Sequence, residues 1–248
     1  MIEKSVSELE RGRSEASHTV LKAIDVGPYL SPPPDTPLPL RYAFYLLENI
    51  QGKVVLDLGC GSGENIAPLL ARGAKVIAVD LSQELVELAV RRIQLHRPSA
   101  SPQFLVASAY DVPLPGDSVD AVLCASLLHH LDIPRAMAEI RRVLKPRGIA
   151  VVKEPVRFSK FAASLRRMLP AQQDISDNEH PLTRAEVEQV KSGWQVSGER
   201  AFRLPFVPLF SREKAIRSIW ALDRWLLGRF TVLEHYSTSR VMKLQKIR

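Results

Sequence analysis

Short apolar runs alternate with amphipathic stretches through the middle of the chain. From their length and apolar composition we predict buried strands at KVVLDL (53–58), KVIAVDL (75–81), QFLVAS (103–108), DAVLCAS (120–126) and GIAVVKE (148–154). Apolar residues at helical spacing predict helices at GENIAPLLARG (63–73), SQELVELAVRRIQLH (82–96) and PRAMAEIRRVLK (134–145). Strands that alternate with helices of this length form a parallel sheet covered on both faces. We therefore expect an α/β fold with a doubly wound sheet.

The last third of the chain has a different pattern. Longer segments with polar alternation, 194–206 and 235–247, predict two strands that are antiparallel neighbours at one edge of the sheet. Between them, residues 211–230 have the apolar spacing of a helix. Near the other end, the proline-rich stretch GPYLSPPPDTPLPL (27–40) separates an N-terminal segment from the rest, because proline cannot continue a helix or sheet interior.

Three glycines follow the first predicted strand, in the sequence LDLGCGSGEN (56–65). In a parallel α/β sheet, ligands bind outside the carboxyl ends of the strands, so this loop is the expected binding site. Glycine lets the backbone turn tightly and approach a ligand closely. We expect a helix that begins near Ser62 to direct free N–H groups at that ligand, and Asp80, which ends the second strand, to bind both hydroxyls of a ribose.

The spacing of the glycines narrows the choice of ligand. A dinucleotide fingerprint requires glycine at position 64, where this chain has Glu64, and a P-loop requires Gly-Lys-Ser/Thr, which is missing here. Asp57 lies beside the loop and can hold an ammonium group. S-adenosylmethionine, which carries an amine and a carboxylate but no pyrophosphate, satisfies these conditions.

Four successive motifs carry a resemblance to a known family. VLDLGCGSGEN, VIAVDLS, ASAYDVPLPGDSVDAVLCASLLHHL and RRVLKPRGIAVV, all within residues 53–154, resemble the motifs of class I S-adenosylmethionine-dependent methyltransferases. The most similar branch is the small-molecule branch that includes the quinone-biosynthesis enzymes (methyltransferase type 11). The resemblance implies a seven-stranded, mostly parallel, Rossmann-like methyltransferase fold with helical cap elements, with S-adenosylmethionine as cofactor and S-adenosylhomocysteine as product.

The resemblance also implies roles for single residues. The methionine part of the cofactor would lie over Asp57, Gly59, Gly61 and Gly63, and Asp80 would bind the ribose. Further along the chain, the implied cofactor contacts are Leu81 and Ala109 against the adenine and Ala125 beneath the cofactor. The family often has an acidic residue where this chain has Ser108, so either Ser108 or Asp111 is expected to accept the adenine amino group.

Methyl transfer requires an aligned acceptor, exclusion of water and, for a hydroxyl acceptor, a group that removes a proton. The candidates are His129, His130, His180 and Glu154, which all follow strands at the same edge of the sheet; no metal site is expected. Histidine titrates near neutrality, although either adjacent histidine alone would also suit an inward-packed structural side chain. Glu154 ends a buried strand, where a carboxylate is costly without a partner, so it could orient a histidine or bind a cationic substrate.

The segments that emerge at this edge indicate the kind of acceptor. We expect residues 1–50 to form an N-terminal helical cap, and residues 51–248 to form the methyltransferase domain with cap insertions at about 155–181 and 207–231. A small or lipid-like, bulky apolar acceptor is indicated by the large side chains of these segments, Phe158, Phe161, Leu165, Met168, Trp220 and Trp225. Oxygen is the favoured target atom. The helix at 211–230 could instead lie in a membrane interface, although packing on the domain core is the preferred interpretation.

Charge and cysteine content set broader limits. The net charge is +7, and residues 160–248, with 16 Lys+Arg against 9 Asp+Glu, account for all of it. This basic third could face an anionic membrane, an acidic substrate or nucleic acid, or form an ordinary solvated surface, which we favour. Against nucleic acid, no NPPY-type motif follows the fourth strand. The two cysteines, Cys60 and Cys124, lack metal-ligand spacing, which fits a cytoplasmic protein.

Three other functions compete with methyl transfer to a small molecule. The cofactor fold could serve non-methyl chemistry such as cyclisation, it could methylate nucleic acid through the basic third, or it could bind the cofactor without turnover. The intact motifs favour an enzyme.

Overall fold

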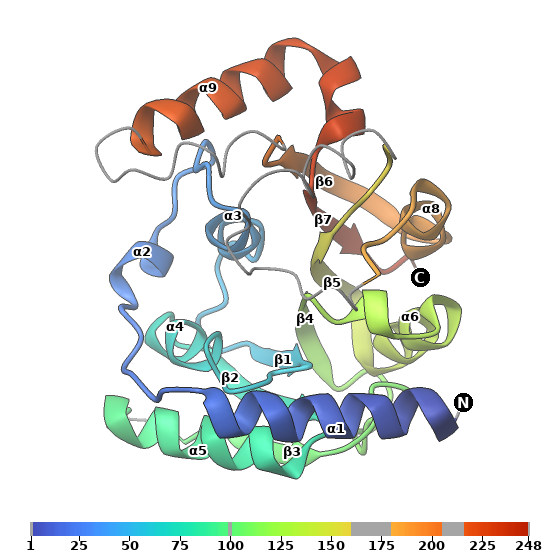
Figure 1. Cartoon of the computed structure of the whole chain (residues 1–248). Helices are drawn as coiled ribbons and strands as arrows, with labels where there is room; N and C mark the ends of the chain where they lie inside the picture. The colour runs from blue at the N-terminus through green and yellow to red at the C-terminus, as the bar shows by residue number, and fades with distance from the viewer. Residues whose placement is uncertain (1, 99–100, 160–179, 205–215, 248) are drawn as a thin grey trace.

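The computed structural model describes residues 2–98, 101–159, 180–204 and 216–247. Seven strands form one sheet in the order β3-β2-β1-β4-β5-β7-β6 (Figure 1). The strands are β1 (Val54–Leu58), β2 (Lys75–Asp80), β3 (Gln103–Val106), β4 (Val119–Ala125), β5 (Leu144–Pro155), β6 (Gln195–Phe202) and β7 (Ser239–Gln245). Strand β7 is antiparallel to both β5 and β6, and the other pairs are parallel. The predicted doubly wound sheet and the antiparallel terminal pair are confirmed.

Helices cover both faces of the sheet (Figure 1). The described helices are α1 (Ile2–His18), α2 (Gly27–Leu30), α3 (Pro39–Leu46), α4 (Ile66–Ala71), α5 (Gln83–His96), α6 (Ile133–Val143), α8 (Arg184–Lys191) and α9 (Ile216–Arg229), with 3-10 turns η1 (Leu128–His130) and η3 (Thr231–Tyr236). Ser82 caps α5 by accepting a hydrogen bond from the Leu85 N–H at 3.3 Å. No helix among the described residues is long and apolar enough to cross a membrane.

The sheet separates two apolar layers. Successive strand residues point to opposite faces, so Val55 and Ala78 pack with α3, α4 and α5, whereas Leu56 and Val79 pack with α6 and α8. Both layers are fully buried at the centre of the sheet. The central strands therefore hold the carboxyl ends of β1, β2, β4 and β5 in fixed register at one edge, where the predicted site residues lie.

Several predicted boundaries were wrong. The fifth strand begins at Leu144 rather than at residue 148, because Leu144 already pairs with Val119, and the helix predicted to reach residue 145 therefore ends at Val143. The helix expected near Ser62 begins at Ile66, because residues 61–65 form turns in which Gly61 and Gly63 have positive φ angles. A left-handed residue cannot continue a right-handed helix. The last strand begins at Ser239 rather than near residue 235, because residues 231–236 form η3. Phe161, Leu165 and Met168 lie outside the described residues.

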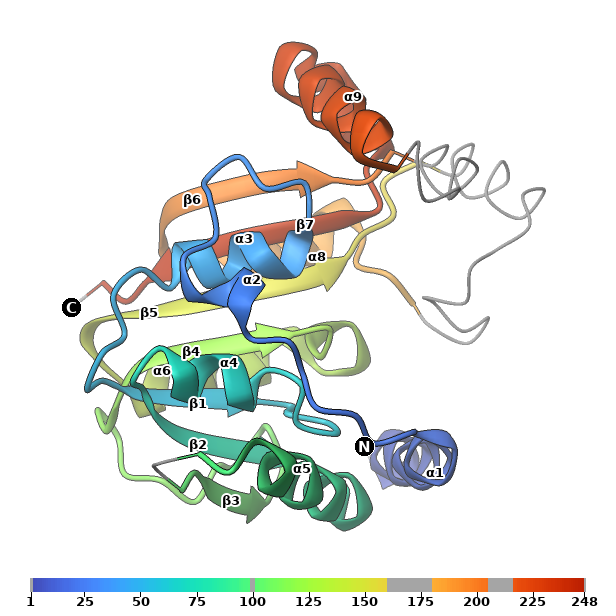
Figure 2. The same ribbon diagram turned by 90° about the vertical axis from the view of Figure 1, so that its left-hand side faces the viewer.

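Helix α1 packs against α5, beyond the carboxyl ends of the parallel strands (Figure 2). Gly12 makes the contact possible, since a Cβ at this position would lie 2.6 Å from the Ser82 Cβ. Arg13 adds an exposed ion pair with Glu84 at 2.8 Å. The N-terminal helix thus contacts Ser82, the N-cap residue of α5, two positions after Asp80.

Helix α9 lies at the β6 end of the sheet (Figure 2). Its inner side chains, including Leu227, pack with Ala201 and Leu204 in a small apolar cluster, so one face of the helix packs on the domain as the sequence favoured. On the outside, Trp225 is 58% exposed and Leu222 is 48% exposed.

Candidate functional site

The loop after β1 is held tightly from both sides. Gly59, Gly61 and Gly63 all have positive φ angles, of 72°, 51° and 83°. A Cβ at Gly59 would collide with the Leu127 side chain at 2.8 Å, and one at Gly63 would collide with Ala89 of α5 at 2.7 Å. A Cβ at Gly61 would meet nothing within 4 Å. Two of the glycines therefore allow close packing of the loop, and the third leaves open space beside its backbone.

Asp57 is completely buried at the carboxyl end of β1. Its Oδ1 accepts a 3.3 Å hydrogen bond from the Asn65 amide, and its Oδ2 has no partner among the described residues. Burial raises the pKa of this carboxyl to about 7, and nearby Asp80 adds to the rise, while the Asn65 hydrogen bond opposes it. A buried polar atom without a partner is costly and rare, so Asp57 is prepared to receive a donor or a cation.

Asp80 connects the glycine loop to the next helix. Its Oδ2 accepts from the Gly61 N–H at 2.8 Å, and its Oδ1 accepts from the Ser82 N–H at 3.0 Å. Each carboxylate oxygen has a second lone pair, so these contacts leave acceptor sites for hydroxyl groups. Leu81, the next residue in the chain, has a partly exposed side chain.

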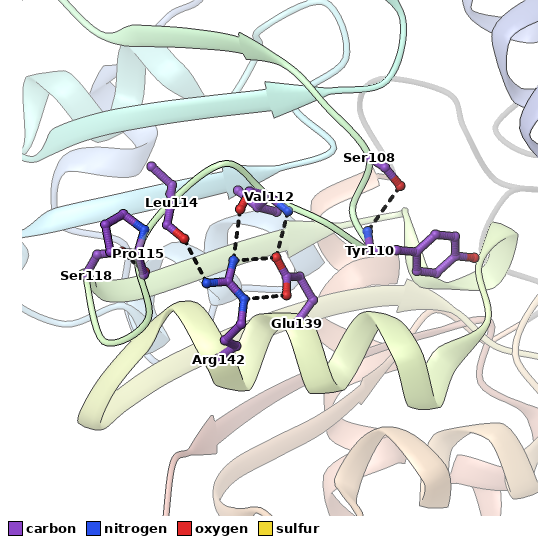
Figure 3. Close-up of polar contacts among 8 residues, drawn as sticks. All are labelled: Ser108, Tyr110, Val112, Leu114, Pro115, Ser118, Glu139 and Arg142. Atoms are coloured by element: carbon purple, nitrogen blue, oxygen red, sulfur yellow. Dashed lines mark hydrogen bonds and ion pairs between the residues drawn. The ribbon is translucent and has the colours of Figure 1, made fainter.

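The loop after β3 carries Ser108 and Ala109. The Ser108 Oγ accepts a 3.2 Å hydrogen bond from the Tyr110 N–H (Figure 3), and the Asp111 N–H donates to the Ser108 carbonyl at 3.1 Å. These contacts close a tight turn in which Ala109 is partly exposed. Ala125 ends β4 at the same edge of the sheet, paired with Lys153 of β5.

His129 and Glu154 form a buried pair at the ends of β4 and β5. The His129 Nδ1 lies 2.7 Å from the Glu154 Oε2, with the two side chains 2% and 0% exposed. The Glu154 Oε1 accepts from the backbone N–H groups of Leu127 and Leu128, at 2.9 and 2.8 Å. In the tautomer whose Nδ1–H donates to Glu154, the Nε2 keeps a lone pair. This Nε2 is buried and has no hydrogen-bond partner among the described residues.

The remaining candidates have different surroundings. The ring of His130 lies 3.8 Å from that of His129, centroid to centroid. His180 is exposed, two residues before Leu182, which exchanges backbone hydrogen bonds with the segment that follows β5. Burial raises the pKa of the Cys60 thiol well above its usual value, which fits a packing residue. No group of His, Cys, Asp and Glu among the described residues could hold a metal ion.

Three supporting residues were not identified from the sequence. Asn65 binds Asp57. Arg92 of α5 is 2% exposed and donates to the Ser62 carbonyl at 2.7 Å and the Ser62 Oγ at 3.1 Å. Glu139 of α6 accepts from the Val112 N–H at 2.6 Å. Arg92 and Glu139 are polar residues within the apolar stripes of their helices, and this mismatch was the available signal.

The strand order, the glycine loop after β1 and the acid that ends β2 define a Rossmann-like fold whose binding edge suits a nucleoside ligand. Residues 56–152 match the family model described as a methyltransferase domain. The resemblance to the S-adenosylmethionine-dependent methyltransferases is therefore confirmed over this part of the chain, and the fold is the Rossmann-like fold of these enzymes.

Individual relatives agree with this result. A demethylmenaquinone methyltransferase of Clavibacter sepedonicus is 38% identical over 106 residues, which are 42% of this chain and 42% of that protein. The solved geranyl diphosphate C-methyltransferase of Streptomyces coelicolor A3(2) has a TM-score of 0.64 at 15% identity, over 98% of each chain. The solved [4+2]-cyclase SpnF has a TM-score of 0.61 at 20% identity, over 84% of this chain and 80% of its own. The chain spans less than half the length of the curated relatives that it matches first.

Proposed function

We propose that this chain transfers the methyl group of S-adenosylmethionine to a hydroxyl oxygen of a small, apolar acceptor. The proposal is supported most by two buried polar atoms that lack partners among the described residues, the Asp57 Oδ2 and the His129 Nε2. They belong to the carboxyl ends of β1 and β4, which are adjacent strands, so a cofactor and an acceptor bound there would meet.

The residues at the glycine loop fit the cofactor. The unpartnered oxygen of Asp57 suits the ammonium of its methionine part, and the open space beside Gly61 leaves room for a ligand to approach the backbone. Asp80 retains lone pairs for the two ribose hydroxyls. We propose that Leu81, Ser108 and Ala109 contact the adenine. Ala125 is proposed to lie beneath the cofactor.

The His129–Glu154 pair supplies the base. When bound, S-adenosylmethionine supplies an electrophilic methyl group on a sulfonium sulfur, and this sulfur becomes a neutral thioether once the methyl group is transferred. His129 accepts the proton of the acceptor hydroxyl at its Nε2 while the new carbon–oxygen bond forms. Glu154 fixes the orientation of the ring and stabilises the imidazolium that results. His130, whose ring is tilted by 45° against this ring, is proposed to line the acceptor site.

An apolar acceptor is supported by one relative. The Clavibacter protein is named for demethylmenaquinone, a largely apolar quinone. We propose that residues 1–50, the segment just after β5 and helix α9 contribute to the cap over the acceptor; the rest of the expected insertions, at 160–179 and 207–215, lies outside the described residues. The outer face of α9 would contact the membrane or micelle from which a lipid-like acceptor comes.

The basic character of the last third does not call for a nucleic-acid partner. Several of its cations pair with carboxylates of the same chain, namely Lys191, Arg224, Arg240, Lys243 and Lys246. These ion pairs support the ordinary surface that the sequence favoured, with a small-molecule acceptor.

Incubation with cofactor labelled in its methyl group tests the proposal. Apolar phenols and naphthols of increasing chain length should acquire the label at oxygen, with one S-adenosylhomocysteine formed for each methyl transferred. Label on carbon or nitrogen alone would overturn the choice of oxygen. A product without label, formed while the cofactor is not consumed, would favour the second candidate, a cyclase, which the likeness to SpnF supports.

A further inference from the structure

The loop after β3 has no strand partner along most of its length, yet its backbone is firmly held. Its entry is fixed because the Ala107 N–H donates to the Asp80 carbonyl at 2.9 Å. The turn itself is closed between Ser108 and Asp111. What holds the exit of the loop, at Val112, is an ion pair on helix α6 (Figure 3).

Glu139 and Arg142 form this pair, and both side chains make hydrogen bonds to the backbone of the loop. The Arg142 Nε and Nη2 bind the two carboxylate oxygens of Glu139, each at 2.7 Å. The same guanidinium donates to the carbonyls of Val112 at 2.9 Å and Leu114 at 2.8 Å. Glu139 in turn accepts from the Val112 N–H at 2.6 Å. Both polar groups of the buried Val112 backbone are thus satisfied by one ion pair (Figure 3).

The chemistry of the pair fits a positioning role. A planar guanidinium binds a carboxylate through two parallel contacts, which fixes direction as well as distance. The hydrogen bonds from Arg142 lower the pKa of Glu139, whose side chain is 9% exposed. Lysine could not make these contacts together, because it is a point donor on a flexible stem.

We infer that Glu139 and Arg142 are positioning residues for the adenosine part of the cofactor, because they fix the exit of the turn that presents Ala109. This inference rests on the proposed function, in which Ala109 lies against the adenine. With the exit at Val112 released, the turn keeps its entry at Asp80 and the Tyr110 hydroxyl, which accepts from the Asp132 N–H at 2.7 Å, but loses the backbone contacts that fix its exit. The loss should therefore fall on adenosine binding, and the methionine side, held by the β1 loop, should be spared.

The test compares Arg142→Lys with Arg141→Lys, a matched control on the same helix. Arg141 also donates to a loop carbonyl, that of Gly193, and lies 4.5 Å from the centre of the Trp194 ring, away from the β3 loop. Calorimetry should give dissociation constants for both S-adenosylhomocysteine and adenosine that rise about tenfold in Arg142→Lys. They should remain at the parent value in Arg141→Lys, and kcat at saturating cofactor should change less than about twofold.

A general loss of stability would also raise both dissociation constants by a common factor, because it lowers the folded fraction that can bind. Thermal unfolding of each variant must therefore show that it is fully folded at the titration temperature, and the tenfold loss is then assigned to the loop. Glu139→Gln keeps an acceptor for the Val112 N–H but removes the ion pair. It should raise both dissociation constants by a smaller common factor. If Arg142→Lys does not fold, Glu139→Gln serves as the test. Parent-like adenosine binding in Arg142→Lys, or in Glu139→Gln where only that variant folds, would overturn the inference. So would a loss seen with S-adenosylhomocysteine but not with adenosine. A parent protein that binds neither ligand would instead refute the proposed function.

Discussion

At the residue scale, Asp57 combines complete burial with a free carboxylate oxygen. Its pKa, raised to about 7 by burial, means that the free protein holds a proton there at mildly acidic pH. In the unfolded chain the same group loses its proton near pH 4. The folded state therefore binds more protons between these values, and the contribution of Asp57 to stability falls as pH rises through that window.

Cofactor binding should show the opposite dependence on pH. An ammonium ligand requires ionised Asp57, so we expect affinity for S-adenosylhomocysteine to rise about tenfold per pH unit below about pH 7 and then level off. Calorimetry near pH 6 in buffers of different ionisation enthalpy should report the release of one proton from the protein. Asp57→Asn should bind weakly, without proton release. A flat profile in the parent would remove Asp57 from the ammonium site.

The base also belongs to the residue scale. His129→Ala should reduce kcat by about 100-fold or more, because the proton of the acceptor then has no nearby base. The dissociation constant for S-adenosylhomocysteine should change less than about twofold. Glu154→Gln should fall between parent and His129→Ala, since the ring remains but its orientation is lost. His235→Ala, at an exposed histidine in η3, is the control.

Parent-like turnover in His129→Ala would assign proton removal elsewhere. In that case His130→Ala is the next variant to measure, since its ring lies beside that of His129.

At the element scale, α9 has an inner face that packs and an outer face that does not. Phe230 and Val232, just beyond its end, are 43% and 71% exposed, and the Phe230 ring lies 6.0 Å from that of Trp225, centroid to centroid. Among the described exposed side chains on α9, Arg229 is cationic, and Arg224 is paired with Asp35. Exposed aromatic residues beside arginine are typical of a helix that lies in a membrane interface.

We therefore expect the protein to co-sediment with vesicles that contain anionic phospholipid. Trp225→Ser combined with Phe230→Ser should reduce the bound fraction several-fold, because two side chains that would enter the interface are removed. Leu95→Ser, at an apolar residue of α5 that is 53% exposed, should have no effect. Equal sedimentation of all three proteins would argue against membrane contact, and a dimer that the double variant dissociates would assign this face to a second copy.

The accuracy of the sequence predictions also varied from element to element. The central strands were placed within one or two residues at most ends, because a buried parallel strand is a continuous apolar run. The predicted start of α4 was wrong because the sequence does not reveal the dihedral angles of Gly61 and Gly63. Glycine is compatible with a helix or with a turn. Asp57 and Asp80 could be proposed as site residues from the sequence because they lie at the carboxyl ends of apolar strands. The clamping role of Glu139 was missed because it depends on a loop that lies 27 positions away in the chain.

At the scale of the whole molecule, a bound cofactor would connect several elements of the fold. Asp57, Asp80 and Ala109 belong to the ends of β1, β2 and β3, and a ligand that contacts all three stabilises them together. We expect S-adenosylhomocysteine at about 1,000 times its dissociation constant to add about 4 kcal/mol to stability. For a chain of this size, the melting temperature should rise by about 10 °C.

Asp80→Ala should lose most of this stabilisation, because the ribose hydroxyls lose their acceptor and the Gly61 N–H loses its partner. Differential scanning fluorimetry with and without the ligand measures the shift. The exposed Asp117→Ala, which lies in the loop before β4, is the control. An equal rise in Asp80→Ala would show that the nucleoside binds without this acid.

The placement of β7 has a consequence for biosynthesis. This strand lies between β5 and β6, although it follows both of them in the chain. While the ribosome is still translating the codons before Ser239, β6 therefore has no neighbour to join, and β5 exposes an unpaired edge that can associate with other nascent chains. The described sheet closes only when residues 239–245 have left the exit tunnel, so the edges of β5 and β6 stay unpaired until then.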